Sequence, residues 1–210
     1  MKTIFLDPGH GGRDPGAVGF GLQEKDLNLK VARYCEDHLN AHYSGHRVVS
    51  SRDGDRQVLL PEIVRKAKAV KADVLVSIHT NAARGTGYES FLQLYPSQEE
   101  TRLQRILHKE VYSSTYKGKF PDRGMKKGTY YVLRNSHCPA ILSENLFIDT
   151  KKDAEFLKVE SNLRAIGEAH AKGIAKFLNL PKKQVAPNAP SSSAGATLKR
   201  IQVAAYHTEK

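Results

Sequence analysis

The sequence predicts a single α/β domain, built around a central, mostly parallel or mixed twisted sheet that is flanked by helices. Short apolar runs of strand type alternate with stretches that carry apolar residues at helical spacing. The 210 residues, 40% of them hydrophobic, are enough for one domain with a substantial core. The alternation stops near Pro181, so a short tail is expected beyond the domain.

The first half of the chain begins with a buried strand at Thr3–Leu6, followed by turn-forming residues from 7 to 23. Helical spacing starts near Glu24 and carries an apolar stripe from Leu27 to Leu39. The next expected elements are a strand at Arg47–Ser50, a helix at Pro61–Lys71 and a strand at Val74–Ile78. The last of these is continuously apolar, which is typical of a strand that is buried on both faces.

The second half continues the alternation. Strands are expected at Tyr88–Leu94, Tyr130–Leu133 and Ala140–Leu142. A helix is expected at Glu100–Tyr112, and residues Lys152–Leu178 are expected to form one long helix or two.

The tail divides the chain into three parts. We expect residues 1–180 to form the main domain, because Pro181 stops the last helix. Residues 181–197 are rich in Pro, Ser and Ala and lack apolar periodicity, so a flexible linker is expected there. Residues 198–210 have an alternating pattern and are expected to be the first strand of a truncated further module.

The composition limits the environment and the partners. No signal peptide is visible, because the apolar run after Met1 is too short, and no stretch could insert into a membrane. The two cysteines do not indicate a disulfide framework, so synthesis and folding in the cytoplasm are expected. The net charge of +11 favours anionic partners. Nucleic acid is not expected, since no helix has a base-reading pattern and no aromatic-basic platform is evident.

Polar side chains at the ends of three apolar strands are the main indication of chemistry. His10 and His79 each follow an apolar strand, and Glu144 follows the run Ala140–Leu142. Ligands of open α/β sheets bind beyond the carboxyl ends of the strands. We therefore expect all three side chains to lie at one edge of the sheet.

These residue types suit a catalytic zinc ion, which typically has three protein ligands and a water. His10 and His79 supply two ligands, and Glu24, at the start of the first helix, is the best third. A nearby carboxylate is needed to take the proton of the water, and Glu144 is the candidate for this base.

Structural roles are alternatives for each of these residues. A histidine at a strand end often has only a structural hydrogen bond, and Glu24 could simply favour the helix dipole. His38 and His42 also have metal-like spacing on a helix, but they lack a neighbouring third ligand. We interpret Arg52 and Glu89 as structural polar contacts near the site, and Asn81 as either a substrate-binding or a loop-supporting residue.

Several segments together resemble the zinc amidases of the Amidase_3 family. They are Asp7–Gly12, Glu24–Leu29, Ser51–Asp53, Ala72–Ala82, Gly87–Glu89 and Pro139–Glu144, and they occur in this order between residue 3 and about residue 178. One departure is the segment Asn145–Thr150, where the family usually has Gly-Phe and then Ser-Asn. The tail segment Leu198–Tyr206 is similar to the opening strand of a SPOR-type peptidoglycan-binding repeat.

The resemblance implies a six-stranded sheet, zinc ligands at His10, Glu24 and His79, and a catalytic glutamate at Glu144. It implies an N-acetylmuramoyl-L-alanine amidase that cleaves the amide bond between N-acetylmuramic acid and the L-alanine of the stem peptide in peptidoglycan. We expect a monomer that acts on the cell wall and reaches it by a route other than a signal peptide, such as lysis of the cell that made it. The alternatives are a peptidase that cuts within the stem and a wall-binding relative without activity.

Overall fold

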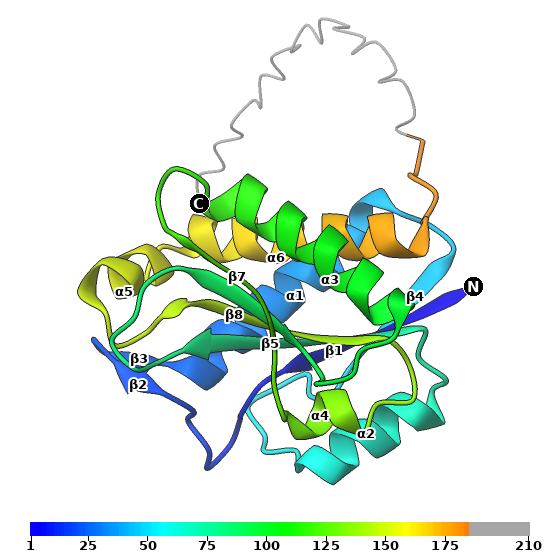
Figure 1. Ribbon diagram of the computed structural model, residues 1–210, viewed down its shortest axis with the longest axis horizontal. Coiled ribbons are helices and arrows are strands. Elements are labelled where there is room, and N and C mark those ends of the chain that lie inside the picture. Colours follow the sequence, from blue (N-terminus) through cyan, green and yellow to red (C-terminus); the bar gives the residue numbers. More distant parts are fainter. Residues whose placement is uncertain (185–210) are drawn as a thin grey trace, which may run out of the picture.

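The computed structural model describes residues 1–184 and contains a central sheet with helices on both faces (Figure 1). The sheet has six strands in the order β4-β1-β5-β8-β6-β7. Their bounds are β1 Lys2–Pro8, β4 His46–Ser50, β5 Val74–Asn81, β6 Tyr88–Leu92, β7 Asp122–Lys127 and β8 Ala140–Phe147. The predicted α/β fold with a six-stranded sheet is therefore confirmed.

The sheet is mixed. Strands β4, β1, β5 and β8 pair in parallel, and β8 pairs with β6 in the antiparallel direction. Strand β7 at the far edge runs parallel to β6. The carboxyl ends of β1, β5 and β8 therefore lie at the same edge of the sheet, as the positions of the polar residues led us to expect.

Two helical layers of unequal size cover the sheet (Figure 1). The three longest helices lie on one face: α1 Glu24–His42, α3 Gln98–Val111 and α6 Glu160–Leu178. The opposite face carries only the shorter helices α2 Leu60–Ala69 and α4 Tyr131–Arg134. The remaining elements are the hairpin β2 Val18–Gly19 and β3 Leu22–Gln23, the π-helical turn Tyr112–Tyr116 that continues α3, and α5 Lys151–Leu157.

Side-chain alternation along the strands divides the core between these layers. In β1, Ile4 and Leu6 belong to the large core under the long helices, whereas Phe5 belongs to the smaller core under α2 and α4. The same alternation puts Leu75 and Leu142 in the smaller core. Residues further along the same faces of β5 and β8, namely Ser77, His79 and Glu144, line a cleft on this thinly covered face.

One strand prediction is wrong. Tyr130–Leu133 is not a strand, because Tyr131–Arg134 forms the short helix α4 with Val132 and Leu133 buried. Short apolar runs do not distinguish strands from helical turns by periodicity, and the aromatic and β-branched residues favoured the wrong choice. The strand that was missed, β7, has the sequence Asp-Arg-Gly-Met-Lys-Lys. Its charged residues are typical of an exposed sheet edge and gave no apolar signal.

The other helices lie close to their predicted positions. Helix α1 begins at Glu24 as expected, and the predicted region 152–178 contains two helices that are separated at Lys158–Val159. Helix α3 begins two residues earlier than expected because Ser97 and Glu100 form a capping box.

The described chain continues a short way beyond the last helix. Pro181 accepts a hydrogen bond from the backbone of Ser44, and the backbone of Lys183 donates one to His42. These contacts lie in the first residues of the expected linker 181–197. The rest of that linker and the expected SPOR-like segment 198–210 lie outside the described residues. Among the described residues, no helix has the length and apolar character needed to cross a membrane.

Candidate active site

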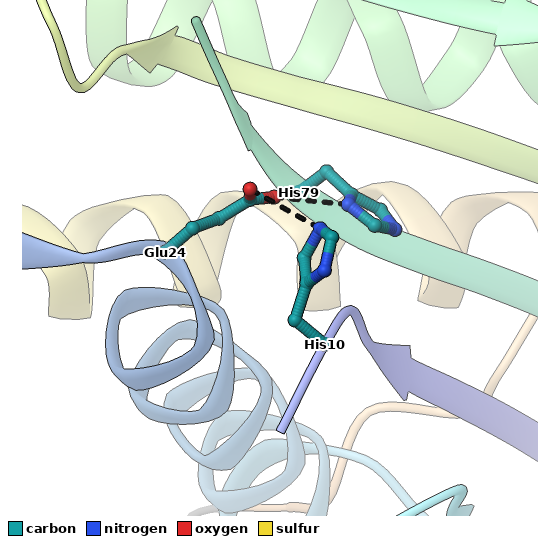
Figure 2. Close-up of side chains that lie close together, drawn as sticks. All are labelled: His10, Glu24 and His79. Atoms are coloured by element: carbon teal, nitrogen blue, oxygen red, sulfur yellow. Dashed lines mark hydrogen bonds and ion pairs between the residues drawn. The ribbon is translucent and has the colours of Figure 1, made fainter. Parts of the chain in front are cut away.

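Three of the expected side chains meet at one point, at the carboxyl edge of the sheet (Figure 2). His10 lies just beyond the end of β1, His79 lies near the end of β5, and Glu24 is the first residue of α1. Glu24 Oε2 lies 3.2 Å from His10 Nε2, and Glu24 Oε1 lies 3.0 Å from His79 Nδ1. The imidazole rings are nearly perpendicular, with centroids 5.1 Å apart.

This arrangement fits a metal ion. One ligand atom from each residue lies within 4.8 Å of the others, and the described part of the chain has no other group of three such side chains. Tetrahedral zinc with ligands at about 2.0–2.1 Å has ligand atoms roughly 3.3 Å apart. The two contacts with Glu24, each through a different carboxylate oxygen, are 3.2 and 3.0 Å. Two imidazoles and one carboxylate are also a donor set that such an ion prefers.

The carboxylate of Glu24 is fixed by the backbone around it. It accepts hydrogen bonds from the backbone N–H of Ala17 at 2.9 Å and of Thr80 at 3.1 Å. The side-chain amide of Asn28, one helical turn further, donates a third at 3.1 Å. These donors come from the segment just before the hairpin, from β5 and from α1, so Glu24 is oriented before any metal binds.

Asp14 orients His10. Its Oδ2 lies 2.9 Å from His10 Nδ1, and its Oδ1 accepts a hydrogen bond from the backbone of Gly16 at 3.0 Å. This leaves Nε2 of His10 as the nitrogen that faces Glu24. A carboxylate on the far nitrogen of a ligating histidine fixes the ring and increases its basicity. The sequence interpretation missed Asp14, although its position four residues after His10 in the loop is a signal that could have identified it.

Arg52 holds the loop that carries His10. Its buried guanidinium donates to the backbone oxygens of Pro8 at 2.9 Å, Gly9 at 3.1 Å and Lys25 at 2.7 Å. It therefore ties the end of β1 to the start of α1, the two segments that present His10 and Glu24. This geometry agrees with the structural role expected for Arg52.

The loop requires special backbone conformations. His10 has φ 65°, a left-handed conformation that costs free energy in a residue other than glycine. A Cβ on Gly9 would lie 2.1 Å from the His79 ring, and a Cβ on Gly16 would lie 2.6 Å from Glu24 Oε2. Glycine is therefore needed at both positions because the loop passes directly against the ligands.

The two histidines and Glu24 shift one another's pKa values. The hydrogen bond to Glu24 raises the pKa of His10 to about 9, against the opposing effect of burial. Hydrogen bonds from both histidines hold the pKa of Glu24 well below its usual range, although burial acts in the other direction. A metal cation would replace these protons, because ligating imidazole must be neutral on the coordinating nitrogen.

Glu144 lies beside the candidate metal ligands, on the same face of the sheet as His79. It is the register partner of His79 on the neighbouring strand β8. Its Oε2 is buried and has no hydrogen-bond partner among the described residues. Burial raises the pKa of Glu144 to about 7, and the carboxylates of Glu24 and Glu89 act in the same direction while His79 opposes them. A carboxyl with this pKa can both accept and donate a proton near neutral pH.

A cleft of about 310 Å³ opens beside these residues. His10, His79 and Glu144 line one end of the cleft. The rim includes Leu59, which is 64% exposed, and Tyr130 beside α4. An apolar rim next to polar reactive groups is the usual form of a small-molecule or polymer-end binding site.

The remaining candidates occupy other environments. His38 and His42 are neighbours with ring centroids 4.3 Å apart, and Glu168 is 4.0 Å from His38. The side-chain amide of Asn81 donates to Glu89 at 2.7 Å, and its oxygen accepts from the backbone of Ala82. These two contacts of Asn81 support the loop after β5.

Comparisons with known proteins identify the family of the chain. The family model Amidase_3, described as N-acetylmuramoyl-L-alanine amidase, matches residues 4–176. A sporulation-specific N-acetylmuramoyl-L-alanine amidase of Bacillus subtilis (strain 168) is 40% identical over 206 residues, which cover 98% of this chain and 76% of that protein. An endolysin of Bacillus phage SPP1 is 42% identical over 185 residues, covering 87% of this chain and 68% of that protein.

Solved structures show the same fold. The catalytic domain of the N-acetylmuramoyl-L-alanine amidase CwlV from Bacillus (Paenibacillus) polymyxa var. colistinus superposes with a TM-score of 0.80 at 30% identity. That match covers 86% of this chain and 99% of the other. An N-acetylmuramoyl-L-alanine amidase from Clostridium difficile 630 gives a TM-score of 0.80 at 32% identity, covering 85% of this chain and 97% of that one.

Proposed function

Because this chain belongs to the Amidase_3 family of N-acetylmuramoyl-L-alanine amidases, we propose that it works with one zinc ion held by His10, Glu24 and His79, and with Glu144 as the general base. The enzyme is a peptidoglycan hydrolase that cleaves the amide bond between N-acetylmuramic acid and the L-alanine of the stem peptide. Cell-wall lysis is the outcome of this cleavage, in agreement with the relative that is named an endolysin.

One observation carries the proposed roles: three ligand atoms converge within 4.8 Å, and a buried carboxyl lies beside them in register with one of the ligands. When bound, zinc supplies a Lewis acid that lowers the pKa of a water to about 7 and polarises the carbonyl of the scissile amide. The chain's own residues supply positioning and proton transfer.

Glu144 moves the proton. The Glu144 carboxylate, which lines the cleft, accepts a proton from the attacking water. With a pKa of about 7, the same carboxyl group then delivers the proton to the nitrogen of the departing amine. The leaving group is thereby released as a neutral amine, the new amino terminus of the stem peptide.

The other residues keep the ligands in place. Asp14 holds Nδ1 of His10, and Arg52 holds the loop between β1 and His10. The three donors to Glu24 keep its two oxygens facing the two histidines. Such support matters because catalytic geometry must be held within about 0.5 Å.

Metal analysis tests the proposal. The purified protein should contain about one zinc per chain, and both His10→Ala and His79→Ala should lose zinc and activity together, because each removes one of three ligands. His137→Ala is a matched control, since His137 is exposed and lies outside the site. Full zinc content in either ligand variant would refute the assignment of that ligand.

The positive charge suits the substrate. We propose that the monomer acts at the cell wall, and that its net charge of +11 favours contact with anionic wall polymers. Raising the salt concentration should weaken co-sedimentation with whole walls more than it slows hydrolysis of a soluble muropeptide, because salt screens exposed charges. Equal salt sensitivity in the two assays would contradict this role.

A further inference from the structure

A pair of cations lies next to the catalytic row of the sheet. His79 on β5 is the register partner of Glu144 on β8, and Glu144 is the register partner of Glu89 on β6. Arg123 and Lys126 of the edge strand β7 both form ion pairs with Glu89. The row of side chains thus runs from the metal ligands, past the general base, to a positively charged end.

Glu89 fixes the two cations. Its carboxylate is 6% exposed; Oε1 accepts the amide of Asn81 at 2.7 Å, and Oε2 accepts Arg123 Nε at 2.8 Å and Lys126 Nζ. The cations hold the pKa of Glu89 below its usual range, although burial opposes them. Glu89 therefore remains charged and serves as an anchor.

The backbone places Arg123 specifically. The register of β6 and β7 shifts so that Tyr88 pairs with Asp122 and Glu89 pairs with Gly124, which leaves Arg123 as the extra residue of a bulge. Bulges of this kind redirect a side chain. The guanidinium lies over the ring of Phe147, 4.8 Å from its centroid, which restricts its movement further.

Hydrogen-bond donors remain free after these contacts. In the part of the chain that the structure describes, the two terminal nitrogens of Arg123 have no hydrogen-bond partner. The side chains of Arg123 and Lys126 are 34% and 38% exposed. One cation would neutralise Glu89, so the second leaves an excess positive charge with donors that face solvent. This is a pre-organised site for an anion.

We propose that Arg123 and Lys126 form the subsite that binds a carboxylate of the stem peptide, and that Glu89 positions both of them. The inference rests on the proposed function, because it assumes that the scissile amide lies at the proposed site. The peptide side of that amide then lies over Glu89, and its other side lies at the apolar rim of the cleft. The length of the peptide agrees with this placement. Two extended residues span about 7 Å. The distance from Glu144 to the cations is similar, because cross-strand neighbours such as Glu144 and Glu89 lie about 5 Å apart and an ion pair adds about 3 Å. The carboxylate is therefore that of the residue after L-alanine.

Binding to a variant without turnover tests the subsite. In the zinc-loaded Glu144→Gln background, calorimetry compares N-acetylmuramoyl-L-alanyl-D-glutamate with its diamide, in which both carboxyl groups of the second residue are amidated. The acid should bind about tenfold more tightly, as expected for one charge-assisted contact. Adding Arg123→Gln or Lys126→Gln should reduce this preference to about twofold or less. Lys127→Gln is the matched control: it lies on the same strand and is exposed, but it pairs in register with Leu92, whose side chain faces the large core.

The outcomes separate the subsite from the enzyme activity. Two results would overturn the subsite, even if the wild-type enzyme releases L-alanine termini. One is that the Glu144→Gln protein has no preference for the acid. The other is that the preference remains when either Arg123→Gln or Lys126→Gln is added. Failure to release those termini would contradict the proposed function, but the binding preference could still be read. Should Arg123→Gln not fold, salt titration of the Glu144→Gln protein decides the matter, because the preference must fall as salt rises. A salt-independent preference contradicts the proposal.

Discussion

His79 and Glu144 lie opposite each other on the adjacent parallel strands β5 and β8, with both side chains lining the cleft. Neighbouring strands are held about 4.8 Å apart by backbone hydrogen bonds. The separation between a proposed metal ligand and the proposed base is therefore set by the centre of the sheet. A mobile loop does not determine it, which suits a reaction that needs a fixed distance between zinc and base.

The general base can be tested by an isosteric change. Glu144→Gln should retain the fold and the zinc content but lose on the order of a hundred- to ten-thousand-fold in kcat, because a positioned proton-transfer group is removed. Turnover on a soluble muropeptide and elemental zinc analysis of the same sample provide the measurements. A kcat close to that of the wild type would refute the role of Glu144.

The support of His10 by Asp14 can be tested through metal affinity. Asp14→Asn should weaken zinc binding by about 10–100-fold, because the carboxylate that orients the ring is lost while the three ligands remain. Competition with a chromophoric chelator gives the affinity. Asp53→Asn is a suitable control, since Asp53 is exposed and its carboxylate contacts only Arg56 in the described residues. Equal affinities in the wild type and Asp14→Asn would contradict the role.

A buried histidine away from the metal should make stability depend on pH. His170 on α6 is completely buried between Ser143 and the backbone oxygen of Ile166, and burial lowers its pKa to about 4. Between about pH 6.5 and 4, the unfolded chain binds a proton at this residue that the folded chain does not. The contribution of neutral His170 to the free energy of unfolding should therefore be complete above pH 6.5. The free energy of unfolding should fall by about 3 kcal/mol as the pH decreases through this window.

Urea denaturation at pH 7 and pH 4.5 measures the effect. The wild type should lose more stability than His170→Asn over this interval, although the variant will be less stable at pH 7 because buried contacts are altered. His137→Asn, at an exposed position, should follow the wild type. The same pH dependence in all three proteins would show that His170 is not responsible.

Truncation tests the domain boundary. We propose that the catalytic domain ends near Leu180, with Pro181 and Lys183 adding two backbone hydrogen bonds of 2.9 Å to the segment after α1. A chain that ends at Gln184 should keep the Tm, zinc and soluble-substrate activity of the full chain. A chain that ends at Leu180 should keep its zinc but melt about 2–8 °C lower, because each lost bond contributes about 1 kcal/mol. Loss of zinc in the shorter chain would place the boundary elsewhere.

The three proposed ligands stand out in the sequence because of the positions they occupy. Histidines directly after apolar strands and a glutamate at the start of a helix need no tertiary information to be noticed. The chain's order of strands and helices likewise indicated the fold class. What remained open was how far each strand extended: β5 and β8 continue through His79 and Glu144, so these residues lie within the sheet instead of beyond it.

The missed features depend on contacts between distant segments. Strand β7 is charged and exposed, so only its pairing with β6 makes it a strand. The cation pair on Glu89 depends on a bulge in that same pairing, and it could not be inferred from the residues Arg123 and Lys126 alone. Asp14 is a different case, because a local spacing in the loop carried the information.

Release of new amino termini from peptidoglycan tests the central claim most directly. Purified peptidoglycan is incubated with the enzyme as isolated, with the enzyme after chelation, and with the chelated enzyme to which zinc is returned. The new termini are then identified. L-Alanine should be the new terminus, and its release should be lost on chelation and recovered with zinc. Termini from within the stem peptide, or L-alanine release that chelation does not change, would contradict a zinc-dependent N-acetylmuramoyl-L-alanine amidase.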